Sequence, residues 1–97
     1  MALNEKYKEE LINIIHTQLP NSTIYLFGSR AINKETIGSD IDIAIDTGSK
    51  IPYETILKIM VAIDQTIIPM KIDLVDMQVV PDTLKHTILK EGIKWIN

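Results

Sequence analysis

Two aspartates stand one residue apart in the segment Asp40-Ile41-Asp42-Ile43. On a β-strand, side chains two residues apart point to the same face, so both carboxylates would lie together while the isoleucines face the other way. Neighbouring carboxylates repel each other unless a cation lies between them. A strand with one solvated polar face is the alternative, but the apolar neighbours favour a site for a divalent metal.

A Gly-Ser pair lies upstream of the aspartates. Gly28 and Ser29 directly follow an apolar run, where glycine allows a sharp turn and the close approach of a ligand. If a helical turn begins there, its backbone N–H groups and the serine hydroxyl could bind phosphate. Many such turns contain Gly-Ser for geometry alone, so the pair by itself is weak evidence of a binding site.

Magnesium is usually bound by one or two carboxylates together with substrate phosphates. Two such ions about 3.5–4 Å apart can hold the attacking and leaving oxygens of an in-line displacement, which calls for a third carboxylate. Asp73, inside a later apolar run, is the best candidate for it. Three other aspartates are less well placed: Asp46, Asp64 and Asp76.

Helices and strands must bring these residues together. Hydrophobic periodicity and helix-breaking residues predict, in the first half of the chain, a helix over 5–18, a strand over 23–27, a helical turn from Arg30, a polar loop over 33–38 and a strand over 40–46. They predict in the second half a helix from Pro52 towards Pro69, a strand over 70–77, a helix from Pro81 with Gly92 as its C-cap, and an edge strand in the tail. This alternation indicates an α+β fold, a small mixed β-sheet flanked by helices.

The composition narrows the classes of function. The 97 residues predict a single domain, 1–97, and the values of 45% hydrophobic and 24% charged residues are ordinary for a globular protein. The net charge of −3 and the scattered lysines argue against direct binding of nucleic acid. The absence of cysteine excludes disulfides and thiolate metal sites. With no apolar run long enough to cross a membrane, we expect a cytoplasmic protein.

The sequence resembles a known superfamily. Gly28-Ser29-Arg30-Ala31, followed after a short loop by Asp40-Ile41-Asp42-Ile43 and later by the strand 72–76, is similar to the nucleotidyltransferase fold of the DNA polymerase beta superfamily. The short length resembles the minimal nucleotidyltransferase branch, whose members are commonly antitoxins paired with all-helical HEPN toxins. The resemblance spans nearly the whole chain, including the closing segment 90–96.

The resemblance implies roles for seven residues. Asp40, Asp42 and Asp73 would ligate two Mg²⁺ ions and carry catalysis, with Asp73 also helping to activate the acceptor hydroxyl. The nucleotide would be bound by residues around the Gly-Ser turn and the loop after it, namely Gly28, Ser29, Arg30 and Ser39. Arg30 would contact phosphate, or instead pair with an aspartate and hold the loop; a lysine cannot replace its planar fork.

The sequence also departs from the usual pattern of this branch. Ile32 and Asn33 stand where a second arginine and a glycine are usual, which removes one possible phosphate or partner contact. Asparagine tolerates left-handed backbone conformations, so we expect the turn to survive.

Two functions from different classes follow. The first is an Mg²⁺-dependent enzyme that transfers AMP, or another NMP, from ATP to a hydroxyl of a HEPN-type toxin and thereby silences it. The second is a non-catalytic antitoxin that binds and occludes its partner. A phosphorelay receiver fits poorly, because no lysine follows a late strand. We expect no second domain, so a partner protein or a homo-oligomer would have to complete the nucleotide cleft.

Overall fold

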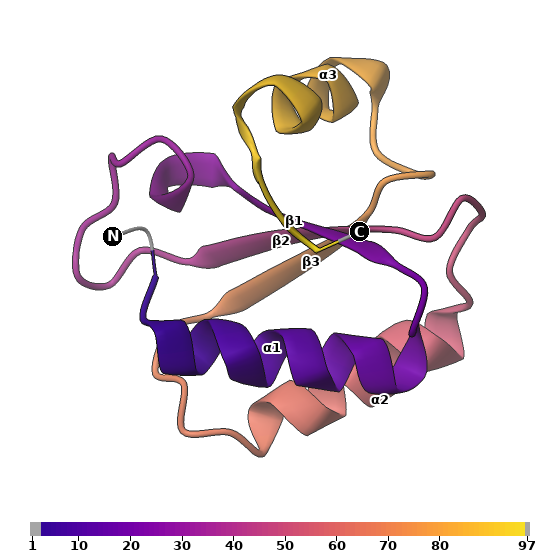
Figure 1. Ribbon diagram of the computed structural model, residues 1–97, viewed down its shortest axis with the longest axis horizontal. Helices are drawn as coiled ribbons and strands as arrows, with labels where there is room; N and C mark the ends of the chain where they lie inside the picture. Colours follow the sequence, from indigo (N-terminus) through magenta and orange to yellow (C-terminus); the bar gives the residue numbers. More distant parts are fainter. Residues whose placement is uncertain (1–2, 97) are drawn as a thin grey trace.

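A single β-sheet organises the chain, and helices cover both of its faces (Figure 1). The computed structural model describes residues 3–96. Its elements are α1 (Glu5–Gln18), β1 (Thr23–Phe27), the 3₁₀ turn η1 (Gly28–Arg30), β2 (Ile41–Asp46), α2 (Tyr53–Asp64), β3 (Ile72–Asp76), α3 (Asp82–Glu91) and β4 (Ile93–Ile96). The predicted order of elements is confirmed, including the edge strand in the tail.

The sheet is mixed. Its strand order is β3-β2-β1-β4; β1 runs antiparallel to both β2 and β4, whereas β2 and β3 run parallel. The parallel pair is possible because α2 carries the chain from the end of β2 back to the start of β3. The predicted α+β class with a small mixed sheet is therefore confirmed.

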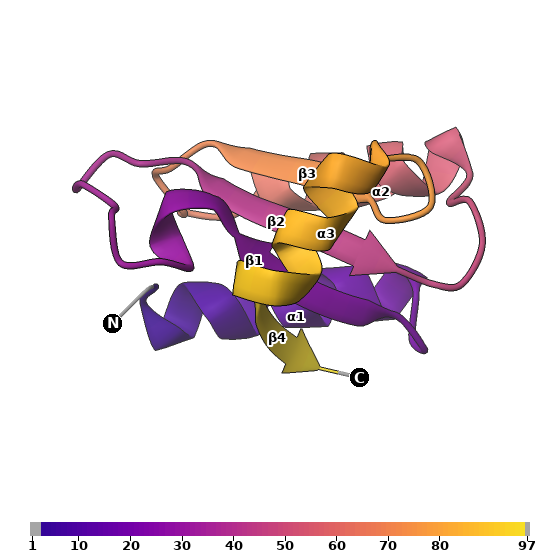
Figure 2. The ribbon, with the colours of Figure 1, turned by 90° about the horizontal axis from the view of Figure 1, so that it is seen from above.

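The alternation of apolar and polar residues in β2 decides which face each helix covers. Ile41, Ile43 and Ile45 are fully buried in the larger core, beneath α1 and α2. The opposite face carries Ala44, which packs in a second core with Met77 and with Ile88 of α3. Figure 2 shows α3 lying across this second face, with α1 beyond the sheet. The face that carries Asp42 is therefore covered by a single short helix.

Several boundaries differ from the prediction. The predicted helix from Pro52 begins at Tyr53 with Pro52 as its N-cap, and it ends at Asp64, well before Pro69. The Thr66 hydroxyl donates to the Ile63 carbonyl and accepts from the Ile68 amide, so a side chain satisfies groups that would otherwise continue the helix. Beyond Asp64, Ile68 and Met70 pack against the larger core from an irregular segment, whereas Ile67 is exposed.

Gly92 ends α3 as predicted, but not through a left-handed backbone. Its φ and ψ of −70° and 155° are extended. A Cβ at this position would collide with the Ile88 carbonyl oxygen and would come within 3.3 Å of the Leu26 carbonyl oxygen. Glycine is required here because α3 turns directly into β4 against the backbone of β1.

Within residues 3–96, the helices are all too short or too polar to cross a membrane.

Candidate active site

Asp42 and Asp73, two of the three predicted acidic residues, meet on the sheet face that α3 covers only in part. β2 and β3 pair so that Asp42 stands directly opposite Asp73. Adjacent strands lie roughly 4.8 Å apart, and side chains in register on parallel strands point to the same face. The two carboxylates are therefore neighbours. Asp40 is exposed and lies just before β2, so the predicted strand over 40–46 begins one residue later.

The electrostatics of Asp42 reflect this crowding. Burial raises the pKa of the Asp42 carboxyl, and the negative charges of Asp73 and Asp40 and a side-chain hydrogen bond with Asp73 raise it further. The positive charge of Lys71 lowers that pKa in part. Asp42 is thus held where its charged form is disfavoured, the situation that a bound cation would relieve.

The Gly-Ser turn closes over the same carboxylate. Phe27, the last residue of β1, pairs with Asp42, so Gly28 follows immediately beside the Asp42 side chain. Gly28 has a φ of +77°, and a Cβ there would collide with Asp42 Oδ2. The turn therefore requires glycine for two reasons: its left-handed backbone and the approach of the carboxylate. The helical turn was predicted to begin at Arg30, but it runs over Gly28–Arg30.

Arg30 fixes the loop that leads to the aspartates. Its side chain is buried, and Nε and Nη2 donate to the Ser39 carbonyl oxygen at 3.1 and 2.9 Å. A forked donor that holds one backbone oxygen sets the position of the residue before Asp40. This geometry matches the predicted loop-holding role, although the acceptor is a carbonyl rather than an aspartate. The predicted phosphate contact of Arg30 stays a prediction.

The loop between the turn and the aspartates is closed by its own hydrogen bonds. The Lys34 amide donates to the Ser29 carbonyl at 2.9 Å, and the Thr36 amide donates to the Ser39 hydroxyl at 2.8 Å. Asn33 takes the left-handed conformation, with a φ of 59°, so the expectation that the turn survives without glycine is confirmed. Ser39 therefore organises the loop; its predicted contact with nucleotide stays a prediction.

The donor set suits a hard divalent cation bound together with phosphates. Asp42 and Asp73 converge, Asp40 is near enough to act on Asp42, and the backbone of Gly28 leaves room beside the Asp42 carboxylate. Within residues 3–96, no three His, Asp or Glu side chains are grouped closely enough to ligate an ion by themselves. Magnesium fits such a site, because it commonly uses one or two carboxylates plus substrate phosphates and water.

Lys71 was not singled out from the sequence as a site residue, but the structure brings it to this site. Its Nζ lies 3.8 Å from Asp73 Oδ1. The sequence contained a signal for it, because Lys71 lies two residues before Asp73, directly ahead of β3, and extended residues two apart share a face.

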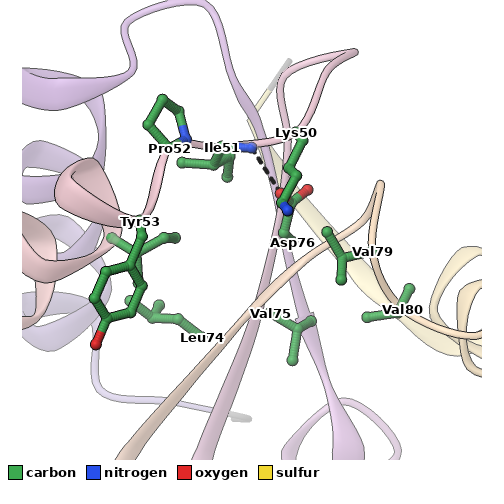
Figure 3. Close-up of a pocket in the computed structure, with 10 residues that line it drawn as sticks. Lys50, Ile51, Pro52, Tyr53, Leu74, Val75, Asp76, Val79 and Val80 are labelled. Carbon is green, nitrogen blue, oxygen red and sulfur yellow. Dashed lines mark hydrogen bonds between the residues drawn. The ribbon is translucent and has the colours of Figure 1, made fainter.

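A hollow lies elsewhere, at the other end of β3. It measures about 660 Å³ and is lined mainly by apolar residues, with Lys50 and Asp76 as its charged members (Figure 3). Both carboxylate oxygens of Asp76 already accept backbone hydrogen bonds, from the Ile51 amide at 2.7 Å and the Gln78 amide at 2.9 Å. This hollow contains none of the predicted site residues, and its one carboxylate, that of Asp76, serves the fold.

Comparison with known proteins places the chain in a family. The family model for the polymerase beta nucleotidyltransferase domain matches residues 9–96. The chain belongs to this family. Among curated proteins, none is similar enough to the sequence to count as a match.

Solved structures agree with this assignment. A toxin–antitoxin crystallised with AMP-PNP is 28% identical, with a TM-score of 0.72 over 98% of this chain and 75% of the other. A mutant of the toxin–antitoxin MntA–HpeT is 29% identical, with a TM-score of 0.68 over 98% and 74% of the two chains. The toxin–antitoxin MntA–HepT has the same fold at 24% identity, with a TM-score of 0.68. The resemblance to minimal nucleotidyltransferase antitoxins, drawn from the sequence, is confirmed.

Proposed function

We propose that this protein is an Mg²⁺-dependent nucleotidyltransferase that moves AMP from ATP to a hydroxyl of a HEPN-type toxin and so neutralises it. The observation that carries the proposal is the register of Asp42 opposite Asp73, beside the Gly28 backbone. The family supports nucleotidyl transfer, and AMP-PNP in a similar toxin–antitoxin supports an adenine nucleotide.

The residues of the site would have three separate roles: phosphate binding, positioning of the loop, and metal binding. Gly28 and Ser29 would bind the nucleotide phosphates, while Arg30 and Ser39 keep the loop before Asp40 in place. Asp40, Asp42 and Asp73 would hold the divalent cations, whose charge neutralises the phosphates during transfer. The catalytic effect would come from positioning and from charge already in place.

The proposed transfer forms one bond at the α-phosphorus of ATP and breaks another, and it needs no reagent besides ATP and the acceptor hydroxyl. The acceptor oxygen forms a bond to the α-phosphorus while the bond from that phosphorus to the pyrophosphate oxygen breaks. The hydroxyl proton passes to the Asp73 carboxylate, and pyrophosphate leaves. Asp73 suits this role because its side chain keeps 46% of its surface exposed, at the open side of the pair.

The experiment uses the purified chain with Mg²⁺, ATP and the product of the neighbouring reading frame, if that frame encodes a HEPN-type protein. Intact-mass spectrometry should show the partner gaining one AMP. The double variant Asp40→Asn/Asp42→Asn should abolish the adduct, whereas Glu9→Gln, at an exposed position on α1, should leave it unchanged. Absence of an adduct with every nucleoside triphosphate tested would overturn the enzymatic proposal.

Neutralisation by binding alone is the second candidate. Exposed apolar side chains on the outer side of α2 favour it, because Leu57, Met60 and Val61 are 41%, 49% and 60% exposed and offer a surface for a partner. The two proposals separate in cells. The double aspartate variant should fail to neutralise the toxin if transfer is required and should neutralise it fully if occlusion suffices.

A further inference from the structure

We propose that Lys71 is an internal counter-ion of the acidic pair: it competes with a bare metal ion for Asp73 and turns to the nucleotide phosphates when metal and nucleotide bind together. This inference rests on the proposed nucleotidyltransferase site. It adds a residue that neither the acidic motif nor the Gly-Ser turn contains.

The position of Lys71 supports this role. Its Nζ lies 3.8 Å from Asp73 Oδ1, and its charge also acts on Asp42. The Lys71 carbonyl accepts from the Ile41 amide at 2.9 Å, so its backbone is anchored between the two aspartates of the β2 motif. The ammonium group therefore lies beside the carboxylates that would ligate the metal.

Two cations cannot share one carboxylate without repulsion. A divalent ion at Asp42 and Asp73 would face the Lys71 ammonium, and like charges that close disfavour each other. The Lys71 side chain is 71% exposed, and within residues 3–96 its ion pair is with Asp73. An exposed ion pair is weak, and a lysine stem has several rotatable bonds, so the side chain can leave at little cost.

A bound nucleotide replaces the repulsion between Lys71 and the metal ion with an attraction. A metal–triphosphate brings net negative charge to the same place, and a lysine ammonium is a flexible point charge suited to phosphate oxygens. Lys71 should therefore weaken the binding of the metal alone and strengthen the binding of metal with nucleotide. A purely structural lysine would move both affinities in the same direction or leave them unchanged.

The test compares the full-length wild type with Lys71→Gln. Mn²⁺ alone, followed by electron paramagnetic resonance, should bind about 2- to 5-fold more tightly to Lys71→Gln, the range of an exposed ion pair. Mg²⁺ with AMP-PNP, followed by calorimetry, should bind about 2- to 5-fold more weakly to the same variant. Lys71→Arg should stay close to wild type in both measurements because it keeps the charge.

The matched control is Lys58→Gln, which removes the same charge from an exposed position on α2, beneath the opposite face of the sheet. If Lys58→Gln changes both affinities as Lys71→Gln does, net charge explains the result and the proposal is wrong. It is also wrong if the two affinities of Lys71→Gln change in the same direction or not at all.

Failure of the underlying metal site would look different. Asp42→Asn should abolish the Mn²⁺ binding that the wild type shows. If the wild type does not bind Mn²⁺, or if Asp42→Asn binds it equally well, both the metal site and the counter-ion role are overturned. If that binding is present but Lys71→Gln leaves it unchanged, only the role of Lys71 fails.

Discussion

Replacing Asp42 by asparagine should stabilise the metal-free protein, although the residue is proposed to be essential for activity. Asp42 and Asp73 stand in register on neighbouring strands, with Asp42 partly buried. Two unit charges about 5 Å apart repel by roughly 3 kcal/mol at an effective dielectric constant of about 20 and by roughly 0.8 kcal/mol in water.

The exposure of the pair and the nearby lysine set the value between these limits. Asp73 keeps 46% of its side chain exposed, and Lys71 offsets part of the repulsion. We therefore expect Asp42→Asn to raise the free energy of unfolding by about 1–2 kcal/mol. For a domain of this size, that raises Tm by roughly 4–15 °C.

The assay is thermal unfolding, followed by circular dichroism, in EDTA and then with Mg²⁺. In EDTA, Asp42→Asn should unfold at a higher temperature than the wild type. Mg²⁺ should raise the Tm of the wild type but not that of the variant, since ligand binding stabilises only the form that binds it. Glu9→Gln, an exposed substitution within α1, should unfold like the wild type under both conditions. A variant less stable than the wild type in EDTA would refute the repulsion between the two carboxylates.

The dependence on pH supplies an independent check that Asp42→Asn stabilises the metal-free protein. The folded-state pKa of Asp42 lies above its unfolded value, so the folded protein binds this proton more tightly than the unfolded chain does. The contribution of Asp42 to stability is therefore complete below the usual carboxyl pKa of about 3.9 and is lost as pH rises through the raised folded value. The advantage of Asp42→Asn should shrink on acidification. An advantage that grows instead would contradict the raised pKa.

Two further substitutions test the turn and the loop. Gly28→Ala forces alanine into a left-handed backbone, which costs about 1–2 kcal/mol, and makes its Cβ collide with Asp42, so it should lower both the stability in urea and the affinity for Mn²⁺. Gly48 also has a left-handed backbone, with a φ of +82°, but a Cβ there meets open space, so Gly48→Ala should lower only the stability. Arg30→Lys loses the paired hydrogen bonds to the Ser39 carbonyl oxygen, so urea unfolding should show a free energy of unfolding lower by about 1–3 kcal/mol. Full stability in that variant would show that these hydrogen bonds are dispensable.

The sequence was sufficient to predict which face each acidic side chain occupies. Alternation with isoleucine puts Asp42 on the polar face of β2, and the same parity puts Asp73 on the matching face of β3. It was not sufficient to predict that these residues stand directly opposite each other. Register depends on how α2 returns the chain, because a slip of one residue would have placed Asp73 on the apolar face of the sheet.

Two other features depended on partners that are distant in the sequence. Arg30 was predicted to contact phosphate, or to pair with an aspartate and hold the loop; it holds the loop through the Ser39 carbonyl oxygen, an acceptor that no pattern of residue types encodes. Gly92 was predicted as a C-cap on propensity, yet it is required because a Cβ would collide with the Ile88 carbonyl oxygen and would also come close to the Leu26 carbonyl oxygen on β1. Periodicity predicts faces and element types; it does not predict contacts between loops and strands.

The features that disfavour stability gather at one end of the sheet. Gly28 has a left-handed backbone, and the Asp42 carboxyl is partly buried against Asp73. Elsewhere, the face of β2 beneath α1 and α2 is an unbroken apolar core. A cation and a phosphate group would relieve the repulsion at the acidic pair, so ligand binding should appear as a gain in folding stability. That gain can be measured on the isolated chain, before any partner or acceptor is identified.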